Sequence, residues 1–454
     1  MLLRQTQVQQ PKKAPSPLVL EKREKIFTAD AGYRSRLPED VLREYAHLIG
    51  RSGIIEELER AYRDPCDLVH VYVARFRTDF GGGSERRLRK KLRAPCAGKG
   101  MTEAQAQASA LGEAVERYSA IFRGDEVRIK ASYRELSSEA IHPNACMNFS
   151  ARQYREREKW NQREAEFNWV PQPFDDERET EWTPVWSLTE ERFKYAATAS
   201  CYFGYPFSSE HDFCRPDSNG NAAGNLEEAI LQGFLEVVER DAVALWWYNS
   251  ARRPRVELAS FGEPYFEALA ELYRILGREM HVLDISADLS IPAFAAVSRG
   301  RKDERDFLLG FGAHLDPRIA IARALTEMNT FLATAIAGEF RRIFVGDPFE
   351  HAFLVPDVLT PIKTRRDYAP FQGEDLREDV RICVELAAKR GLETLVLDQT
   401  RSDVRMRAVK VIVPGMRPWW ARFAPGRLYQ VPVEMGWQAA PLSQEQLNPC
   451  HLAV

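Results

Sequence analysis

The chain has 454 residues, 44% of them hydrophobic and 28% charged, which suits a large two-lobed domain or about two to three smaller ones. A formal net charge of −3 provides no basic field that would draw the protein to nucleic acid or to an anionic membrane. Its seven scattered cysteines lack a C-x2-C spacing, which argues against a disulfide scaffold and a zinc site, and without a signal-like or membrane-spanning run we expect a cytoplasmic protein.

The sequence predicts several segments of different structure along the chain. Proline and polar residues predict a disordered lead over residues 1–18. Residues 19–64 are predicted to be an N-terminal helical segment, with the helix itself between Glu39 and Tyr62. The alternating segment LVHVYVARF (68–76) predicts a strand near the start of a main domain over residues 65–454. Within that domain we expect a charged surface insertion with local helix (145–180), a strand (193–207) and a C-terminal tail (440–454).

Two segments of the second half resemble each other. Residues 265–300 and 375–415 each read as an amphipathic helix, a strand ending in Val-Leu-Asp and a second apolar strand. Convergent helix–strand patterning is the alternative explanation, because that order is common. The pattern predicts a mixed α/β (α+β) fold with an internal pseudo-repeat, in which mixed sheets are flanked by helices.

Two helical segments share the pattern S/Q-x3-E-x2-E-R. The first contains Ser109, Glu113, Glu116 and Arg117, and the second contains Gln232, Glu236, Glu239 and Arg240. The four offsets fall on one helix face. Both segments are otherwise rich in Ala, Leu, Val and Phe, as in buried helices, where carboxylates are costly unless a cation satisfies them.

A solvated helix face with Glu–Arg pairs within each helix is the plainer reading of either copy alone. The repetition in apolar flanks favours a functional site instead. A third apolar helix, within 316–337, carries Arg323 and Glu327 one turn apart and could complete that site. Carboxylates at this density would raise one another's pKa unless they bound a cation, and Mg²⁺ commonly bridges carboxylates and phosphates. The pattern therefore indicates a Mg-nucleotide site, although no Walker A or G-x-G-x-x-G motif is present.

Aromatic residues near these segments have a simpler interpretation. Trp246, Trp247 and Tyr248 directly follow the second Glu-rich segment and are predicted to lie in the core. Trp419 and Trp420 follow Pro418 and are predicted to be packing or dimer contacts.

Three segments together resemble the YcaO family. They are AGKGMTEAQAQASALGEAVERYSA, DSNGNAAGNLEEAILQGFLEVVERDAVALWWYN and RIAIARALTEMNTF. The WWYN sequence, the segment VPGMRPWWARFAPGRLYQVPVEMGW and the NP-x-H ending are similar to its azoline-forming cyclodehydratase branch, the stand-alone D-protein type of thiazole/oxazole-modified peptide biosynthesis. The chain departs from the family in being one residue shorter between Gly224 and Glu227, and in ending LNPCHLAV rather than in a proline-rich tail.

The resemblance implies a YcaO-type fold with ATP and Mg²⁺ held between the two Glu-rich helices. Arg240 and Arg323 would be catalytic, and Glu113, Glu116, Glu228, Glu236 and Glu239 would bind the metal. The full nucleotide-binding set would be Ser109, Glu113, Glu116, Asn225, Glu228, Gln232, Glu236, Glu239, Arg240 and Arg323.

The implied activity is ATP-dependent conversion of Cys, Ser or Thr of a ribosomal precursor peptide into thiazoline or oxazoline, by phosphorylation of the backbone amide oxygen. A thioamide or amidine product, or a non-catalytic peptide-docking scaffold, are the alternatives. The expected partners are the precursor peptide, a leader-binding partner of the E1-like, ThiF type and, in some pathways, a flavin dehydrogenase. We also expect a homodimer, with no nucleic acid and no membrane as partner.

Overall fold

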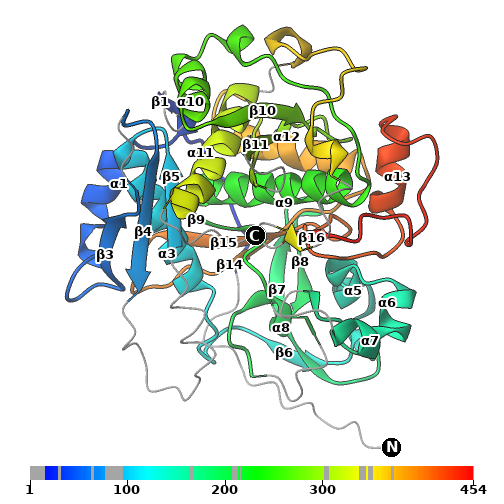
Figure 1. Ribbon diagram of the computed structural model, residues 1–454. Coiled ribbons are helices and arrows are strands. Elements are labelled where there is room, and N and C mark those ends of the chain that lie inside the picture. The colour runs from blue at the N-terminus through cyan, green and yellow to red at the C-terminus, as the bar shows by residue number, and fades with distance from the viewer. Residues whose placement is uncertain are drawn as a thin grey trace, which may run out of the picture.

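The structure is a computed structural model that describes residues 16–28, 32–62, 66–76, 96–162, 168–206, 213–214, 216–300, 306–336, 344–345, 351–369 and 373–452. It is a mixed α+β fold in which several antiparallel sheets surround one long central helix (Figure 1). Within the described ranges, no helix combines the length and the apolar character needed to cross a bilayer. The thiols of Cys96, Cys146, Cys201, Cys214 and Cys383 are free.

The N-terminal part corrects two predictions. A short hairpin, β1 (Ile26–Thr28) and β2 (Gly32–Arg34), precedes α1 (Pro38–Glu44) and a 3-10 turn (Ala46–Leu48). The predicted helix ends there, because residues 55–60 form a strand, β3 (Ile55–Arg60), which pairs with β4 (His70–Phe76). The predicted boundary at residue 65 is therefore wrong, since β3 belongs to the same sheet as β4 and β5 (Cys96–Gly100). Sheet pairing between distant segments overrides the helical propensity of the Glu-rich sequence here.

The first Glu-rich helix, α3 (Glu103–Ser119), packs on this sheet. Thr102 caps it by accepting a hydrogen bond from the Gln105 N–H at 3.3 Å. Gly98 of β5 allows the close approach, because a Cβ there would lie 2.1 Å from the carbonyl oxygen of Ala106 and from the nitrogen of Ala110. The strand thus fixes the depth at which α3 sits.

A second sheet has the order β6 (Ile129–Ala131), β7 (Thr180–Ser187), β14 (Leu395–Asp398), β15 (Arg407–Ile412) and β9 (Asn221–Gly224), with β8 (Arg192–Ala197) also pairing with β7. The strand predicted over 193–207 therefore ends early, because α8 (Thr198–Cys201) follows it. A third sheet contains β10 (Arg278–Asp284), β11 (Ala293–Gly300) and β12 (Phe307–Ala313).

The predicted order of helix, strand and second strand is confirmed in both segments. Helix α10 (Pro264–Ile275) precedes the antiparallel hairpin β10–β11, and α12 (Leu376–Ala388) precedes the antiparallel hairpin β14–β15. The Val-Leu-Asp sequences occupy the same place in both, with Asp284 opposite Phe294 and Asp398 opposite Val409. Both aspartates accept a hydrogen bond from the backbone N–H two residues on, which is turn chemistry.

The second Glu-rich helix, α9 (Leu226–Tyr248), has 23 residues and runs through the middle of the molecule (Figure 1). It packs against β15 and β9 on one side and against β11 and β12 on the other. Helix α11 (Pro317–Ile336) covers β12, where a Cβ on Gly312 would lie 2.2 Å from the carbonyl oxygen of Ala320. A helix enclosed by two sheets must be apolar around most of its surface, as α9 is.

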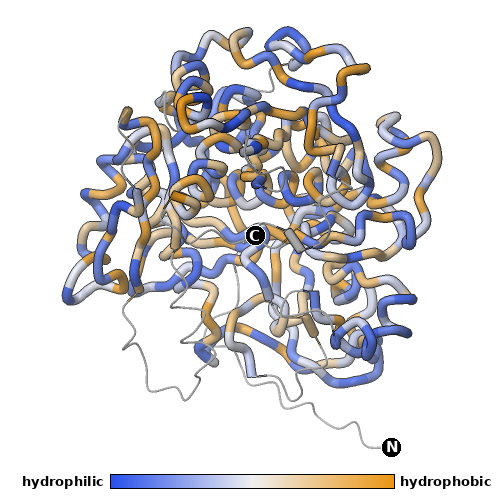
Figure 2. The backbone as a smooth tube through the Cα atoms, in the orientation of Figure 1, coloured by the Kyte–Doolittle hydropathy of each residue, from blue (hydrophilic) through white to orange (hydrophobic). Residues whose placement is uncertain are grey.

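The charged insertion contains the local helices that its sequence predicts: α5 (Pro143–Met147), α6 (Ala151–Arg155) and α7 (Arg157–Asn161). The corner formed by α6 and α7 carries hydrophilic residues on the outside (Figure 2). It is anchored by the buried Gln153, which donates to the Ala421 carbonyl at 3.0 Å and accepts from the Phe423 N–H at 3.0 Å. The segment is therefore packed against the loop that follows β15.

The C-terminal tail binds to the end of α9. Trp247 donates from its indole to the Cys450 carbonyl at 2.7 Å, and β16 (His451–Leu452) pairs with β13 (Phe344–Val345). Residues 453–454 lie outside the described part, as do residues 1–15 of the predicted lead. The remaining elements are α4 (Tyr133–Leu136), α13 (Arg427–Glu434) and the 3-10 turns Ser137–Glu139, Leu258–Phe261, Ala352–Leu354 and Arg365–Asp367.

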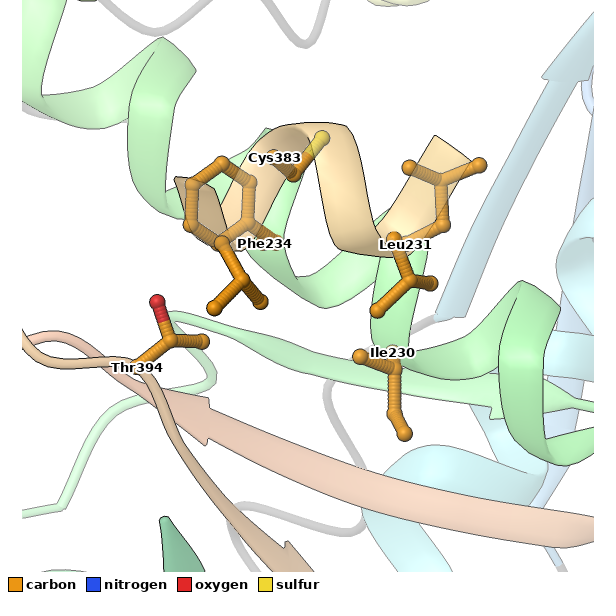
Figure 3. Close-up of a pocket in the computed structure, with 7 residues that line it drawn as sticks. Ile230, Leu231, Phe234, Cys383 and Thr394 are labelled. Atoms are coloured by element: carbon orange, nitrogen blue, oxygen red, sulfur yellow. The ribbon is translucent and has the colours of Figure 1, made fainter. Parts of the chain in front are cut away.

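Between α9 and α12 lies an apolar gap that is lined by Leu231, Phe234 and Cys383 among others (Figure 3). It has no room for a water molecule. The gap is therefore part of the packed core between the two helices and not a ligand site.

Candidate functional site

One face of α9 is partly exposed to solvent, whereas the rest of the helix is buried. Between Glu227 and Tyr248, the side chains of Glu228, Gln232 and Glu236 are partly exposed and the others are buried. These residues are four apart and form one line along the helix, which we call the α9 stripe. The sequence pattern predicted a polar face of this kind, and the structure shows that it is the only open part of this described stretch.

Each Glu-rich helix carries the same internal ion pair. On α3 Arg117 pairs with Glu113, and on α9 Arg240 pairs with Glu236, both with the i, i+4 spacing. Ser109 lies half-buried one turn before Glu113. The plainer reading of the motif, a Glu–Arg pair within each helix, is therefore correct as far as it goes. It leaves out Glu116 and Glu239.

Contacts between elements join the three helices. Arg323 of α11 donates a hydrogen bond to the side-chain oxygen of Gln232 on the α9 stripe. Lys99 of β5, the strand under α3, forms an ion pair with Glu327 of α11. The polar face of 316–337 thus contacts α9 through Arg323, and through Glu327 it contacts the strand on which α3 packs.

The carboxylates lie close enough to repel one another. Burial raises the pKa of Glu116 well above its usual range, and the charges of Glu236 and Glu113 raise it further. Burial also raises the pKa of Glu239 to about 7, helped by Glu327 on α11. The pKa of Glu113 is also raised, mainly by burial. Carboxylates on three helices therefore share one region in which a cation would be stabilising.

The guanidinium of Arg323 faces the same region. Burial lowers its pKa, while the charges of Glu239 and Glu236 oppose that shift. Arg323 is partly exposed, and one of its terminal nitrogens donates to Gln232. Such a group is suited to phosphate oxygens.

At the N-terminus of α9 a different set of contacts holds Glu228. Its carboxylate accepts from the Ser35 hydroxyl at 2.8 Å and from Arg34 at 3.2 Å. Asn225 caps the helix by accepting from the Glu228 N–H at 2.9 Å, and its amide donates to Ser35. Asn225 thus serves as the helix cap and contacts the chain that follows β2.

Four site neighbours were not named as site residues from the sequence: Arg34, Ser35, Lys99 and Trp419. Lys99 lies in the AGKG segment directly before the first Glu-rich helix, which was a visible signal. Arg34 and Ser35 come from a hairpin with no such pattern. The Trp419 ring lies against Arg240, with 4.2 Å between the guanidinium carbon and the ring centroid. Trp246, Trp247 and Tyr248 are fully buried core residues, as predicted.

The donor set fits a magnesium ion that is bound together with phosphates. Across the described residues, no three His, Cys, Asp or Glu side chains form a metal-binding group by themselves. Mg²⁺ in nucleotide sites takes one or two carboxylates and completes its octahedron with phosphate oxygens and water. Carboxylates with raised pKa values beside arginines match that requirement, so the fold and this group of side chains are those of the magnesium-nucleotide-binding class of proteins.

The chain belongs to the YcaO family. The model of the YcaO cyclodehydratases, a family that binds ATP and Mg²⁺, matches residues 97–417. The cofactors predicted from the sequence, ATP and Mg²⁺, are those of the family, and the prediction of a YcaO-type fold is confirmed.

Solved structures agree with that assignment. The chain is 49% identical to a heterocyclase in complex with substrate and cofactor, with a TM-score of 0.89 over 97% of this chain, and 46% identical to the heterocyclase TruD, with a TM-score of 0.76 over 96%. It spans 59% and 55% of the length of those two chains. A YcaO protein from Methanopyrus kandleri, bound with AMPPCP and Mg²⁺, shares the fold at 24% identity and a TM-score of 0.63.

Among curated sequences, an uncharacterized protein of Methanothermobacter thermautotrophicus is 31% identical over 70% of this chain and 81% of its own length. A Rhizobium leguminosarum protein from the tfuA 3′ region is 39% identical over 44% of this chain and 52% of its own length.

Proposed function

We propose that the protein is an ATP- and Mg²⁺-dependent cyclodehydratase that converts Cys, Ser or Thr residues of a ribosomally made peptide into thiazolines or oxazolines. The observation that supports this most is the α9 stripe, whose carboxylates face those of α3 beside Arg323 of α11. The chain is 49% and 46% identical in sequence to two heterocyclases. This similarity favours an azoline product over a thioamide or an amidine.

In the proposed reaction, the thiol or hydroxyl of the substrate residue adds to the carbonyl carbon of the preceding residue. The γ-phosphoryl group of ATP is transferred to the oxygen of that carbonyl, which makes the oxygen a good leaving group. The carbon–oxygen bond then breaks with release of phosphate, the amide nitrogen loses its proton, and a C=N bond forms in the ring. ATP and peptide thus become ADP, phosphate and a peptide lighter by one water per ring.

The chain's own residues would bind and orient. Phosphoryl transfer depends mainly on positioning and charge neutralisation. Arg240 and Arg323 would donate to phosphate oxygens as the catalytic pair, and Ser109, Asn225 and Gln232 would contact the nucleotide. The proposed metal set is Glu113, Glu116, Glu228, Glu236 and Glu239, and a bound Mg²⁺ would neutralise charge on the transferred phosphate.

Partner proteins belong to the same proposal. We include a leader-binding partner of the ThiF type that delivers the precursor peptide, a homodimeric state and, in some pathways, a flavin dehydrogenase that oxidises the azoline rings. Activity of this chain alone on a full-length precursor at the same rate as with the partner would contradict the delivery role.

The direct experiment incubates the protein with a precursor peptide, its partner and MgATP, and measures peptide mass and ADP. Loss of one water per ring, with ADP formed in step, is the expected result. Exchange of oxygen for sulfur would indicate a thioamide enzyme, and an unchanged peptide without ADP would indicate a docking scaffold. Glu239→Gln serves as the inactive variant. Glu271→Gln is its matched control, because Glu271 is exposed on α10 and pairs with Arg274.

A further inference from the structure

Arg240 is held from two sides. Glu236 pairs with its guanidinium along α9, and the guanidinium carbon lies over the Trp419 ring, 4.2 Å from the ring centroid. Arg240 is 8% exposed, and its Nε has no hydrogen-bond partner among the described residues. The side chain is therefore fixed in place while part of its donor capacity is unused.

Trp419 is itself fixed by contacts to α9. The Tyr248 hydroxyl donates to the Trp419 carbonyl at 2.8 Å, and the N–H of Arg417, two residues earlier, donates to Asp241 at 2.8 Å. Asp241 is the residue directly after Arg240. The loop after β15 is thus hydrogen-bonded to α9 next to Arg240 and near the helix end, which sets the position of the indole.

An aromatic face holds a guanidinium in a way that a second carboxylate could not. Stacking attracts the cation through the ring quadrupole and uses none of the N–H donors, which lie in the guanidinium plane. A carboxylate in the same place would occupy donors and add negative charge to a region where carboxylates already repel one another. Stacking thus limits the motion of Arg240 and leaves its edge open to an anion.

We infer that Trp419 is a positioning residue that holds Arg240 with its N–H groups directed to the phosphate oxygens of the nucleotide, an inference that rests on the proposed function. The packing role predicted from the sequence is part of its role: Trp419 is 7% exposed and lies 6.0 Å from Phe311, between ring centroids. What that prediction missed is the charge that the ring contacts.

The chain offers a matched control for core packing. Trp246 lies in the same hydrophobic cluster, is fully buried, and also neighbours Phe311, at 6.3 Å between centroids. Its recorded ring contacts are aromatic: Trp247, Phe311 and Phe353. Truncation of either tryptophan removes a large buried ring, but only Trp419→Leu removes the stack on Arg240.

The experiment measures binding of Mg-AMPPCP by calorimetry for the wild type, Trp419→Phe, Trp419→Leu, Trp246→Leu and Arg240→Lys, with thermal unfolding of each. Trp419→Leu should weaken binding about tenfold and Trp419→Phe much less, because phenylalanine keeps an aromatic face. Trp246→Leu should lower the unfolding temperature to a similar degree and leave affinity within about threefold of the wild type.

Double variants separate positioning from general damage. Trp419→Leu combined with Arg240→Lys should bind no more weakly than Arg240→Lys alone, whereas Trp246→Leu with Arg240→Lys should show additive effects. Additive losses for the Trp419 pair, or unchanged affinity in Trp419→Leu, would overturn the inference. A wild type that binds Mg-AMPPCP but leaves every peptide unchanged would refute the proposed reaction and not the positioning role. A wild type that does not bind the nucleotide would refute both.

Discussion

Arg323 of α11 donates a hydrogen bond to the side-chain oxygen of Gln232 on α9, across 91 residues of sequence. The contact joins α11 to α9 and holds the guanidinium of Arg323 at the α9 stripe. Gln232 occupies in α9 the motif position that Ser109 has in α3. The residue four before the first glutamate therefore has a definite structural role in the second helix, which is to orient the guanidinium of Arg323.

Replacement of Gln232 by leucine tests that role. Without its acceptor, Arg323 loses a charge-assisted hydrogen bond and its fixed orientation, so affinity for Mg-AMPPCP should fall about tenfold. Calorimetric titration measures the change. Arg274→Ala is the control, because Arg274 is exposed on α10 and pairs with Glu271. Equal affinities in Gln232→Leu and wild type would show that Arg323 needs no support from α9.

Glu116→Gln and Glu239→Gln should separate stability from function. Both carboxyls have pKa values raised by burial and by neighbouring glutamates, so the neutral amide of the same shape removes a repulsion. We expect unchanged or higher unfolding temperatures and a loss of ATP turnover of about a hundredfold or more. Differential scanning calorimetry and ADP release measure the two quantities. Near-normal turnover in either variant would mean that the motif is a salt-bridged helix face and nothing more.

The stability of the ligand-free protein should fall as pH rises through the range that Glu239 titrates. Its pKa is raised to about 7 in the folded state, above the ordinary glutamate value, so the folded protein binds the proton more tightly than the unfolded chain does. Unfolding free energy therefore decreases with pH between about 4.5 and 7 through this group, and levels off above. Urea unfolding at several pH values, as the difference between wild type and Glu239→Gln, isolates the contribution.

Magnesium nucleotide should reverse that loss. A ligand that binds the ionised carboxylates stabilises the folded protein increasingly at pH 8, where they are deprotonated. The stabilisation by Mg-AMPPCP should therefore be larger at pH 8 than at pH 5.5 in the wild type. An effect of the same size at both pH values would argue that these carboxylates do not face the ligand.

The positive charge of Lys99 should favour the ionised form of Glu239. Lys99 lowers the pKa of Glu239, and it pairs with Glu327, which raises it. Lys99→Met leaves both carboxylates without that cation, so it should destabilise the protein more at pH 8 than at pH 5.5. Lys99→Met combined with Glu327→Leu should recover most of the loss, because it also removes the unpaired charge. If the double variant is no more stable than the single one, the pair acts through packing.

Particular residues show which features of the fold and the site can be predicted from the sequence. The register of Glu113, Glu116, Glu236 and Glu239 follows from helical periodicity, which is local, and the structure places both patterns on helices. The repeat of 265–300 and 375–415 was visible for the same reason. Strand β3 was not, because IEELER reads as helix and becomes a strand only by pairing with β4. Trp419 lies 179 positions from Arg240 in sequence and contacts it across a loop, so no spacing rule could connect them.

The depth at which α3 packs on its sheet depends on Gly98 of β5. Gly98→Ala would place a Cβ 2.1 Å from backbone atoms of Ala106 and Ala110, which cannot move without displacing the helix. We expect a loss of about 2 kcal/mol or more in unfolding free energy, and weaker nucleotide binding because Glu113 and Glu116 move with α3. Gly112→Ala is the matched control within α3, since a Cβ there meets nothing within 4 Å and alanine favours the helix by about 0.5–1 kcal/mol. Chemical denaturation of both variants decides the point: a Gly98→Ala protein as stable as Gly112→Ala would show that the strand does not set the depth of the helix.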